Sequence, residues 1–538
     1  MGFSSLFVGA TGVVAHGNRM QVVANNLANV STMGFRRADA LFCDAMSRQL
    51  ASGGGQYESG ASYSSQIGMG VAMSAVRNIF TQSGLELTST STDLAISGNG
   101  FFGVRDPGSE GAAGATHYTR AGAFRFDLDA YLVDPHGFRL QGYVVDRQTG
   151  EVSNQVSDVQ LPYEDVIIDG QPARVVRSQP RATSSVAMVT NLDAMSGDKH
   201  SSETNPFFAM LAAYDGSRAD GNPFGDNQPA YSSNLTVYDS EGNERKLSVH
   251  FDPVDTSTLS NAVPGYIYWE YLVALPTSAD GSDAFNTSSA GLAGMGVLVF
   301  TDQGELVEQS AYSLDPGARA DGKVLSNWAP ASFSADGKPE FSFTYGSNGA
   351  AIGEMVTISY DFGLTSRTSS WKPGGATAAD VGRNANNLPG MDDARRDARI
   401  TTSYDQSSFT LFQIQDGHTW GYLLNTSVDK DGFLSGYFSN GQSEQFYQVA
   451  NYRFTSEWGL RRAGNNHFVS TDASGEAIVG KAGQGGRGFF EQNSLETSNV
   501  DMAQEFADMI ITQRGYQANT KVITTTDSLL NTLISIKR

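Results

Sequence analysis

The chain has 538 residues, which exceeds a single core of about 100 to 200 residues, so three or four domains are expected. Lys and Arg number 36 against 57 Asp and Glu, and the resulting formal net charge of −21 excludes nucleic acid as an expected partner, because it would repel phosphates. The single cysteine, Cys43, excludes an internal disulfide framework and a thiolate metal site.

Membrane segments are not expected either. No apolar run approaches the roughly 18 residues that a membrane-spanning helix needs. The stretch from Met1 to Ala10 lacks the positive start, sustained apolar run and small-residue cleavage site of a signal peptide. If the protein leaves the cell, we expect it to use another export route.

The first predicted element is an amphipathic helix over residues 3 to 27. Its apolar or small residues are separated by alternating gaps of three and four, as in a coiled coil. Small side chains in the second of its two rows would let a partner helix approach closely, and Gly34 is a candidate stop. The rows are Leu6, Val13, Met20 and Leu27, and then Phe3, Ala10, Gly17 and Ala24.

The middle of the chain predicts β-structure, with no long helical pattern between about residues 100 and 490. A Gly-, Ser- and Tyr-rich stretch over 52 to 70 precedes it and predicts an extended or loop segment. Residues 235 to 238 and 247 to 251 flank an acidic Gly-Asn turn and predict a hairpin. Further strands are predicted at 267–275, 296–301, 341–345, 355–360 and 408–415.

The last predicted element is a long helix over 499 to 538, which no proline interrupts. Ser498 and Asp501 form a plausible capping arrangement, and the helix would be about 55 Å long. Its companion row, from Phe506 to Ile534, is only partly apolar. The main row, spaced by sevens, is Met502, Met509, Tyr516, Ile523 and Leu530.

The two end helices are each marginal alone, because neither has a neighbouring helix in sequence. Mutual pairing would bring both chain ends into one domain, with everything between them inserted. Periodicity alone leaves a second interpretation open, in which two ordinary amphipathic helices pack on one globular core.

Candidate chemistry is sparse along the chain. Seven histidines are scattered with no pair at helical ligand spacing, so no zinc site is expected. Asp127 with Asp129 and Asp429 with Asp431 lack a full calcium loop, and hairpin turns explain them better. No catalytic, cofactor-binding or metal-binding residue is therefore proposed from the sequence, and no enzyme activity is expected.

Three segments of the chain resemble a known family. ANNLANVSTMGFRR (24 to 37), DLAISGNGFFGV (93 to 104) and YTRAGAFRFDLDAYLVDPHGFRLQGY (118 to 143) resemble landmarks of the flagellar rod and hook proteins. The ending from Leu495 onward is similar to that of hook members in particular. The motif residues are Asn25, Asn26, Asn29, Gly34, Phe35, Asn499, Asp501, Gln513 and Arg514.

The resemblance implies a mainly β fold with terminal α-helices, in a nested multi-domain chain. The N- and C-terminal helices would pair as a coiled coil, with β-rich core and outer β-domains inserted between them. Its expected parts are a terminal coiled-coil domain lining a channel (1–30 and 499–538), a connector (31–75 and 485–498), an inner β-domain (76–165 and 405–484) and one or two outer β-domains (166–404).

The same resemblance implies a structural subunit that polymerises into the curved hook of the flagellum and acts as a universal joint. Expected partners are other copies of the chain, the flagellar rod, the hook cap, the hook–filament junction proteins and the type III export apparatus. The expected location is extracellular, on the flagellum above the basal body, after export without a cleaved signal peptide. Two alternatives stay open at this point: a distal rod subunit, and a secreted β-rich adhesin or glycan-active protein.

Overall fold

The computed structural model describes residues 2–49, 66–108, 116–147, 149–168, 171–347, 349–352 and 355–536. Most of the stretch predicted to be extended, residues 52 to 65, lies outside these residues. The chain divides into two compact units. Unit 1 combines the two ends of the chain, residues 1–178 and 422–538, and unit 2 is the continuous stretch 179–421.

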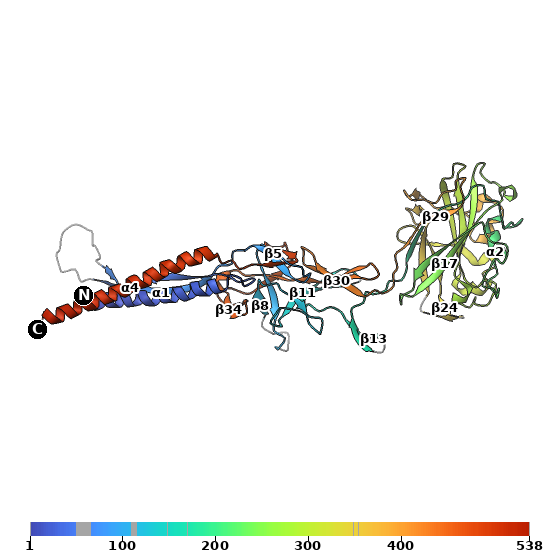
Figure 1. Cartoon of the computed structure of the whole chain (residues 1–538). Coiled ribbons are helices and arrows are strands. Elements are labelled where there is room, and N and C mark those ends of the chain that lie inside the picture. Colours follow the sequence, from blue (N-terminus) through green and yellow to red (C-terminus); the bar gives the residue numbers. More distant parts are fainter. Residues whose placement is uncertain are drawn as a thin grey trace, which may run out of the picture. The chain divides into compact units, whose positions relative to one another are not determined.

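Two long helices in unit 1 confirm the predicted terminal helices. Helix α1 (Gly2–Ala28) and helix α4 (Met502–Ile536) lie side by side and antiparallel, so that the chain's two ends lie close together (Figure 1). Asp501 caps the start of helix α4, because its Oδ1 accepts hydrogen bonds from the backbone N–H groups of Ala503 (2.8 Å) and Gln504 (3.1 Å). No helix among the described residues is long and apolar enough to cross a membrane.

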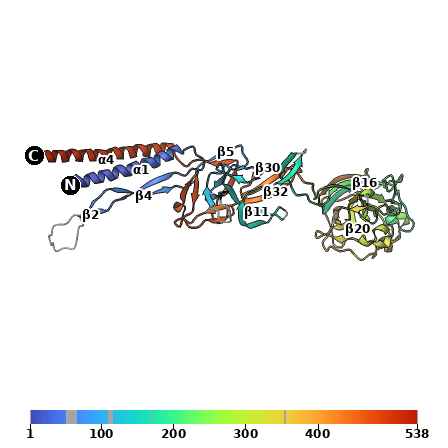
Figure 2. The same ribbon diagram turned by 90° about the horizontal axis from the view of Figure 1, so that it is seen from below.

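A β-hairpin covers a second side of α1. Strands β1 (Ala38–Asp44) and β4 (Val71–Asn78) pair antiparallel, and Figure 2 shows α1 between this hairpin and α4. The Thr11 hydroxyl accepts a hydrogen bond from the Val71 N–H (3.4 Å), and the His16 ring packs edge-on against Phe42 at 5.8 Å. Helix α1 is therefore held between two elements of its own subunit.

The rest of unit 1 is a 13-stranded sheet with short paired strands beside it. Its core contains Phe102, Phe124, Leu140 and Phe490, all nearly inaccessible to solvent. The sheet contains β7 (Phe101–Arg105), β8 (Thr116–Thr119), β9 (Arg125–Phe126), β10 (Leu132–Val133), β11 (Arg139–Val145), β12 (Val152–Asp158), β30 (Leu423–Val428), β31 (Phe433–Phe438), β32 (Ser443–Val449), β33 (Asn451–Arg453), β34 (Arg461–Gly464), β35 (His467–Val469) and β36 (Ile478–Gly480). The shorter pairs are β2 (Ser47–Gln49) with β3 (Gln66–Gly68), β5 (Leu85–Leu87) with β38 (Ser494–Glu496), β6 (Leu94–Ser97) with β37 (Phe489–Gln492), and β13 (Glu164–Ile168) with β14 (Gln171–Val175).

Two turns of this sheet explain the paired aspartates. The Asp127 carboxylate accepts hydrogen bonds from the N–H groups of Asp129 and Tyr131, at 2.9 and 2.8 Å. Asp429 does the same for residues 431 and 433 between β30 and β31. Both carboxylates therefore form hairpin turns, as predicted in preference to calcium loops.

Unit 2 is built from two mostly antiparallel sheets that pack around an aromatic core. Side chains of both sheets meet there, among them Trp269, Tyr271, Phe341 and Tyr360, each at most 1% exposed. One sheet follows the order β16 (Tyr231–Tyr238), β17 (Glu244–Pro253), β18 (Ile267–Ala274), β19 (Leu292–Phe300), β20 (Leu306–Leu314) and β21 (Trp328–Pro330). The other follows β22 (Ser332–Phe333), β23 (Pro339–Phe343), β26 (Val356–Asp361), β15 (Ser185–Asn191) and β29 (Phe409–Gln415).

Short elements complete unit 2, and all the strands predicted between 235 and 415 are present, although their ends differ by a few residues. The fold class is confirmed: mainly β, with paired helices at the two ends of the chain. The short elements are α2 (Ala209–Ala213), α3 (Ala378–Val381), and the pairs β24 (Gly346–Ser347) with β25 (Ala350–Ala351) and β27 (Leu364–Ser366) with β28 (Ala394–Arg396).

Candidate assembly interface

Glycines let α1 and α4 approach closely. A Cβ added to Gly12 would lie 2.5 Å from Cγ of Asn519, and one added to Gly9 would lie 2.9 Å from Ile523 Cγ1. On the facing helix, a Cβ at Gly515 would lie 2.6 Å from Cε1 of His16. A larger side chain at any of these positions would therefore force the facing side chains of Asn519, Ile523 or His16 to shift.

The contact between the helices is offset from the predicted rows. Two buried threonines of α4 direct their hydroxyls to their own helix, Thr512 to the Asp508 carbonyl (2.7 Å) and Thr526 to the Val522 carbonyl (2.8 Å), so they pack as small residues. Small and polar side chains thus make up most of the buried positions of this contact, and a search for large apolar residues overlooks them. The buried positions are Gly9, Gly12, Ala15, Val23 and Asn26 of α1 and Glu505, Thr512 and Thr526 of α4.

None of the described residues of the predicted rows with a large side chain is fully buried, although Ile523 packs against Gly9. Met502 and Tyr516 are exposed, at 50% and 38% of their surface. Ala10 and Ala24 of the second α1 row are exposed as well. The others are half-buried: Leu6, Val13, Met20 and Leu27 on α1, and Met509, Ile523 and Leu530 on α4.

A charged cluster fastens the first turns of α4 to the end of α1. The amide of Asn26 donates to Glu505 (3.2 Å) and to the Ala38 carbonyl (2.7 Å), and its oxygen accepts from the Ala38 N–H. Arg37 forms ion pairs with Glu505 at 2.6 Å and with Asp508 at 3.5 Å, and Arg19 reaches Asp508 at 3.2 Å. Glu505 is only 1% exposed, so this cluster fixes the relative register of the two helices.

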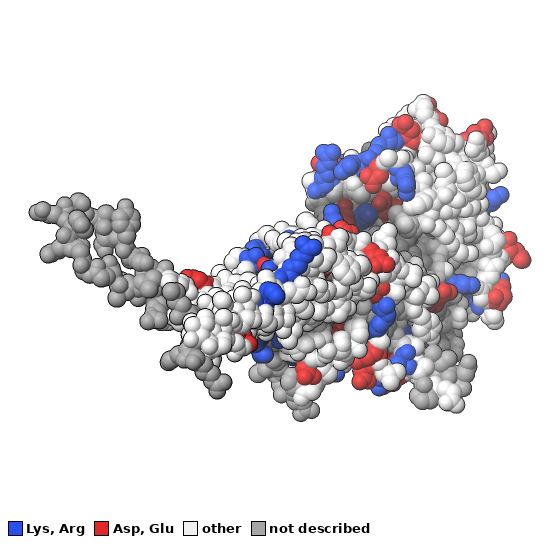
Figure 3. Space-filling view, turned by 60° about the vertical axis from the view of Figure 1, so that its left-hand side comes forward, with Lys and Arg blue, Asp and Glu red and all other residues white. Residues whose placement is uncertain are grey.

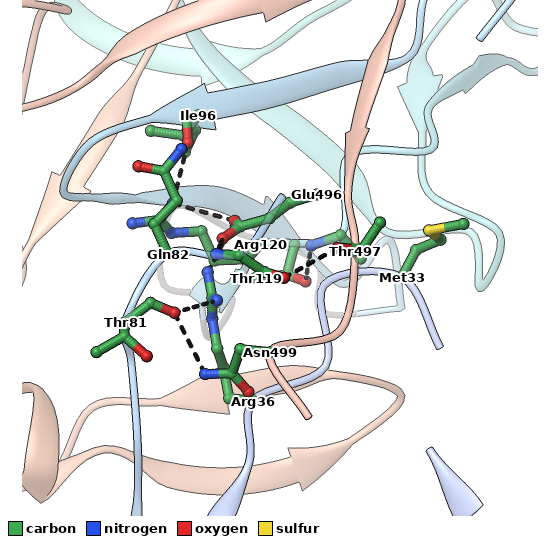
Figure 4. A network of polar contacts seen from close by, with 12 residues as sticks. Met33, Arg36, Thr81, Gln82, Ile96, Thr119, Arg120, Glu496, Thr497 and Asn499 are labelled. Carbon is green, nitrogen blue, oxygen red and sulfur yellow. Dashed lines mark hydrogen bonds and ion pairs between the residues drawn. The ribbon is translucent and has the colours of Figure 1, made fainter. Parts of the chain in front are cut away.

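A second, buried cluster joins residues from the two ends of the chain (Figure 4). Glu496 accepts hydrogen bonds from Arg36 at 2.7 Å and Arg120 at 3.1 Å, and from the Ser83 N–H at 3.0 Å. Arg36 also donates to the carbonyl of Thr81, while Arg120 donates to two further carbonyls. We call Arg36, Arg120 and Glu496 the buried clasp.

Burial shapes the electrostatics of the buried clasp. Desolvation lowers the pKa of Arg120 to about 10, although the adjacent Glu496 carboxylate raises it. Arg120 therefore stays cationic at neutral pH. One carboxylate facing two guanidinium groups leaves a positive excess, which the carbonyl oxygens of Thr81, Ile96 and Gly98 offset through hydrogen bonds.

The family-motif residues gather around the buried clasp and the helix ends. Gly34, at φ +70°, donates its N–H to the Glu496 carbonyl (2.7 Å), and a Cβ there would lie 2.6 Å from the Ala121 nitrogen. Phe35 is buried, and Asn499 accepts from the Arg37 N–H at 2.6 Å and donates to the carbonyls of residues 79 and 81.

The remaining motif residues lie further from the clasp. Asn29 donates to the Asn25 side chain (2.7 Å) and backbone (2.9 Å) where α1 ends. Asp501 caps α4, and Gln513 and Arg514 are exposed on its surface. The structure therefore brings Asn26, Gly34, Phe35 and Asn499 together and leaves Gln513 and Arg514 apart from them.

Sequence reasoning missed the residues of the charged contacts, namely Arg36, Arg37, Arg120, Glu496 and Glu505. The family resemblance could have indicated them, because all five lie in segments that resemble the family. Arg36 and Arg37 end the segment 24 to 37, Arg120 lies in 118 to 143, and Glu496 and Glu505 follow Leu495. Their pairing was not deducible, since Arg36 and Glu496 are 460 positions apart.

Large apolar side chains stay exposed on both helices. Phe7 and Val14 of α1 are 53% and 62% exposed. So many exposed large apolar residues are unusual for a surface that meets only water. On α4 the exposed positions are Phe506, Ile510, Ile511, Val522, Leu529, Leu533, Ile534 and Ile536, at 44 to 80%.

Charged side chains show no such concentration on the face seen in Figure 3. Acidic and basic groups there are interspersed, with broad uncharged areas between them.

Comparison with known proteins identifies the class first. Family models for the flagella basal body rod protein (residues 6–36), the flagellar hook protein FlgE/F/G D1 domain (95–170), the flagellar basal body protein FlaE D2 domain (212–418) and the flagellar basal body rod FlgEFG protein C-terminal region (491–536) match this chain. These models, together with the paired terminal helices, define a protein of the flagellar rod and hook class.

Relatives that match this chain over its full length identify the family within this class. The flagellar hook proteins FlgE of Treponema pallidum and Borreliella burgdorferi are each 30% identical to this chain, with 99% of both chains covered. That of Escherichia coli is 25% identical over 98% of both. The chain belongs to the flagellar hook protein family. It is a structural subunit of the hook of the bacterial flagellum, and these matches do not favour the distal rod or adhesin alternatives.

Proposed function

We propose that copies of this chain polymerise through the exposed apolar faces of α1 and α4 into a curved, flexible tube, which acts as a universal joint and transmits motor torque from rod to filament. One observation carries the proposal: the contact inside one subunit is built mostly of glycines, threonines and charged groups, while many large apolar side chains of both helices stay exposed. Burying those side chains against neighbouring copies would contribute about 25 cal/mol per Å² of apolar surface.

The predicted rows have a natural place in this arrangement. Seven of the row residues are half-buried in the single subunit: Leu6, Val13, Met20, Leu27, Met509, Ile523 and Leu530. We infer that their remaining surface, together with that of Met502 and Tyr516, is covered by neighbouring subunits. The paired helices would then line a central channel.

Partners and location follow from the same proposal. We infer contacts with the flagellar rod, the hook cap and the hook–filament junction proteins, and an extracellular position above the basal body. Export would proceed through the flagellar type III apparatus, without a cleaved signal peptide. The domain limits expected from the sequence stay a prediction within this scheme, and we propose no catalytic role.

The test uses a position that is exposed in the single subunit. Leu533 is 65% exposed, so Leu533→Asp should leave the subunit folded, with unchanged circular dichroism. A carboxylate in a buried helix contact costs several kcal/mol, so the variant should form no tubes in electron microscopy and no hooks in cells. Ile523 is a poorer choice, because its side chain also packs against Gly9.

Gln517→Asp is the matched control, because it adds the same charge to the same helix at an exposed polar position. We expect it to polymerise as the natural chain does. Normal tubes from Leu533→Asp, or equal loss of tubes from both variants, would contradict assembly through the apolar face.

A further inference from the structure

Four side chains from three separate segments of the chain converge on one place in unit 1. Asp134 and His136 belong to the turn between β10 and β11. His467 begins β35, and His117 lies on the adjacent strand β8. Asp134 and His467 are 333 positions apart, which explains why the spacing of the histidines did not indicate a site.

The donor atoms of three of these residues already face one another. His467 Nε2 lies 2.7 Å from Asp134 Oδ2, and His136 Nδ1 lies 3.9 Å from the same oxygen. One ligand atom from each of the three residues falls within 4.8 Å of the other two. Ligands at about 2.0 to 2.2 Å from a tetrahedral ion lie about 3.4 Å from one another. His136 must therefore move closer by rotation, and the 2.7 Å contact between His467 and Asp134 must open slightly to admit the ion.

The surroundings fix two of the ligands and leave the third accessible. Asp134 Oδ1 accepts hydrogen bonds from the N–H groups of His136 and Phe138, both at 2.9 Å, so Oδ2 remains directed at His467. The Phe138 ring packs edge-on against His467 at 4.6 Å. The Asp134 and His467 side chains are 4% and 3% exposed, whereas that of His136 is 44% exposed and gives an ion a route from solvent.

His117 supplies a further donor beside this group. Its ring stacks on Phe138 at 5.0 Å and lies 5.6 Å from the His467 ring. Its Nδ1 is enclosed and has no hydrogen-bond partner among the described residues. A buried polar atom without a partner calls for an explanation, and a bound water or ion is one that fits an imidazole nitrogen.

We propose that Asp134, His136 and His467 bind a divalent transition-metal ion of the Zn²⁺ type, with His117 beside it as a fourth ligand or a support. Two imidazoles and one carboxylate are a donor set suited to zinc, whereas magnesium and calcium prefer oxygen ligands throughout. The ion would tie the turn at 134 to 137 to strand β35, and would stabilise unit 1 by mass action.

The experiment uses the purified full chain, free of any affinity tag and stripped of metal with a chelator. Titration with ZnCl₂ should show one equivalent bound, and the thermal unfolding temperature should rise with added Zn²⁺. His136→Ala removes an exposed ligand and should leave the fold intact. It should weaken Zn²⁺ binding at least about tenfold and abolish the thermal shift.

His418→Ala is the matched control, because it removes a half-buried histidine of unit 2. It should bind Zn²⁺ as the natural chain does. If Zn²⁺ does not bind the natural chain, or binds His136→Ala equally well, then His467 and Asp134 form only a structural hydrogen bond and the proposal is overturned. Asp134→Asn provides a second variant, and unchanged binding by it would overturn the proposal as well.

Discussion

The helix pair of unit 1 and the two sheets of unit 2 differ in where their large apolar side chains lie. Unit 2 encloses its aromatic residues, with Trp269 and Tyr360 fully buried. The helices expose large residues such as Ile511 and Leu533 and bury Gly12 and Thr512. Unit 2 therefore completes its core within one chain, whereas the helices leave large apolar side chains exposed, which in the proposed assembly are covered by neighbouring subunits.

The largest effect on unit 1 is expected at the buried clasp. Glu496→Gln would leave Arg36 and Arg120 buried without a counter-charge, and should lower the free energy of unfolding of unit 1 by about 3 to 5 kcal/mol. Hydrogen exchange should show faster exchange in unit 1 and no change in unit 2. Glu491→Gln, at an exposed position of β37, is the control. A loss below about 1 kcal/mol would contradict the importance of the clasp.

A smaller effect is expected where the helices approach most closely. Gly12→Ala would collide with Asn519, whose Nδ2 donates to the Gly515 carbonyl at 2.8 Å, and should destabilise the helix pair by about 1 to 3 kcal/mol. Gly17 has no atom within 4 Å of an added Cβ, so Gly17→Ala should stabilise α1 by up to about 1 kcal/mol. Thermal unfolding of the two variants, followed by circular dichroism at 222 nm, would measure both effects. Equal effects of both substitutions would show that the glycines do not set the helix spacing.

Unit 2 should respond to pH through Glu270. Desolvation raises the pKa of this carboxyl, whose oxygen accepts a hydrogen bond from the Met210 N–H at 2.9 Å. The pKa of Glu270 is therefore higher in the folded than in the unfolded protein. The contribution of this carboxyl to the folding stability is fully present at low pH and is lost as the pH rises above its unfolded pKa near 4.5. Glu270→Gln should therefore gain stability relative to the natural chain between pH 5 and pH 8, measured by urea unfolding. A pH-independent difference would contradict this.

The smallest effect on the single subunit is expected at the exposed apolar face. Leu533→Asp should change the free energy of unfolding of the monomer by less than about 0.5 kcal/mol. The same substitution should abolish tube formation, so stability and assembly separate at this position. A large loss of monomer stability would show that α4 buries this face within its own chain.

Much of the fold was predictable from local signals. The heptad spacing located both helices, Asp501 marked the start of α4, and alternating residues such as Leu235 and Val237 located the strands of unit 2. These features depend on residues close together in sequence.

The contacts that hold the ends together were not predictable. The closest helix packing rests on Gly9, Gly12 and Thr512, which carry no hydrophobic signal. The buried clasp and the histidine group join residues more than 300 positions apart, and no local pattern indicates which charge meets which.

The buried clasp also constrains the order of folding. Arg36 emerges early in synthesis, but Glu496 follows 460 residues later, and α1 gains its partner helix only after that. Unit 2 is one continuous stretch and needs nothing beyond residue 421. Contacts between distant residues form slowly, because a long loop must close first. We therefore expect unit 2 to fold while the ends are still open, with the helix pair as the last part of the subunit to close.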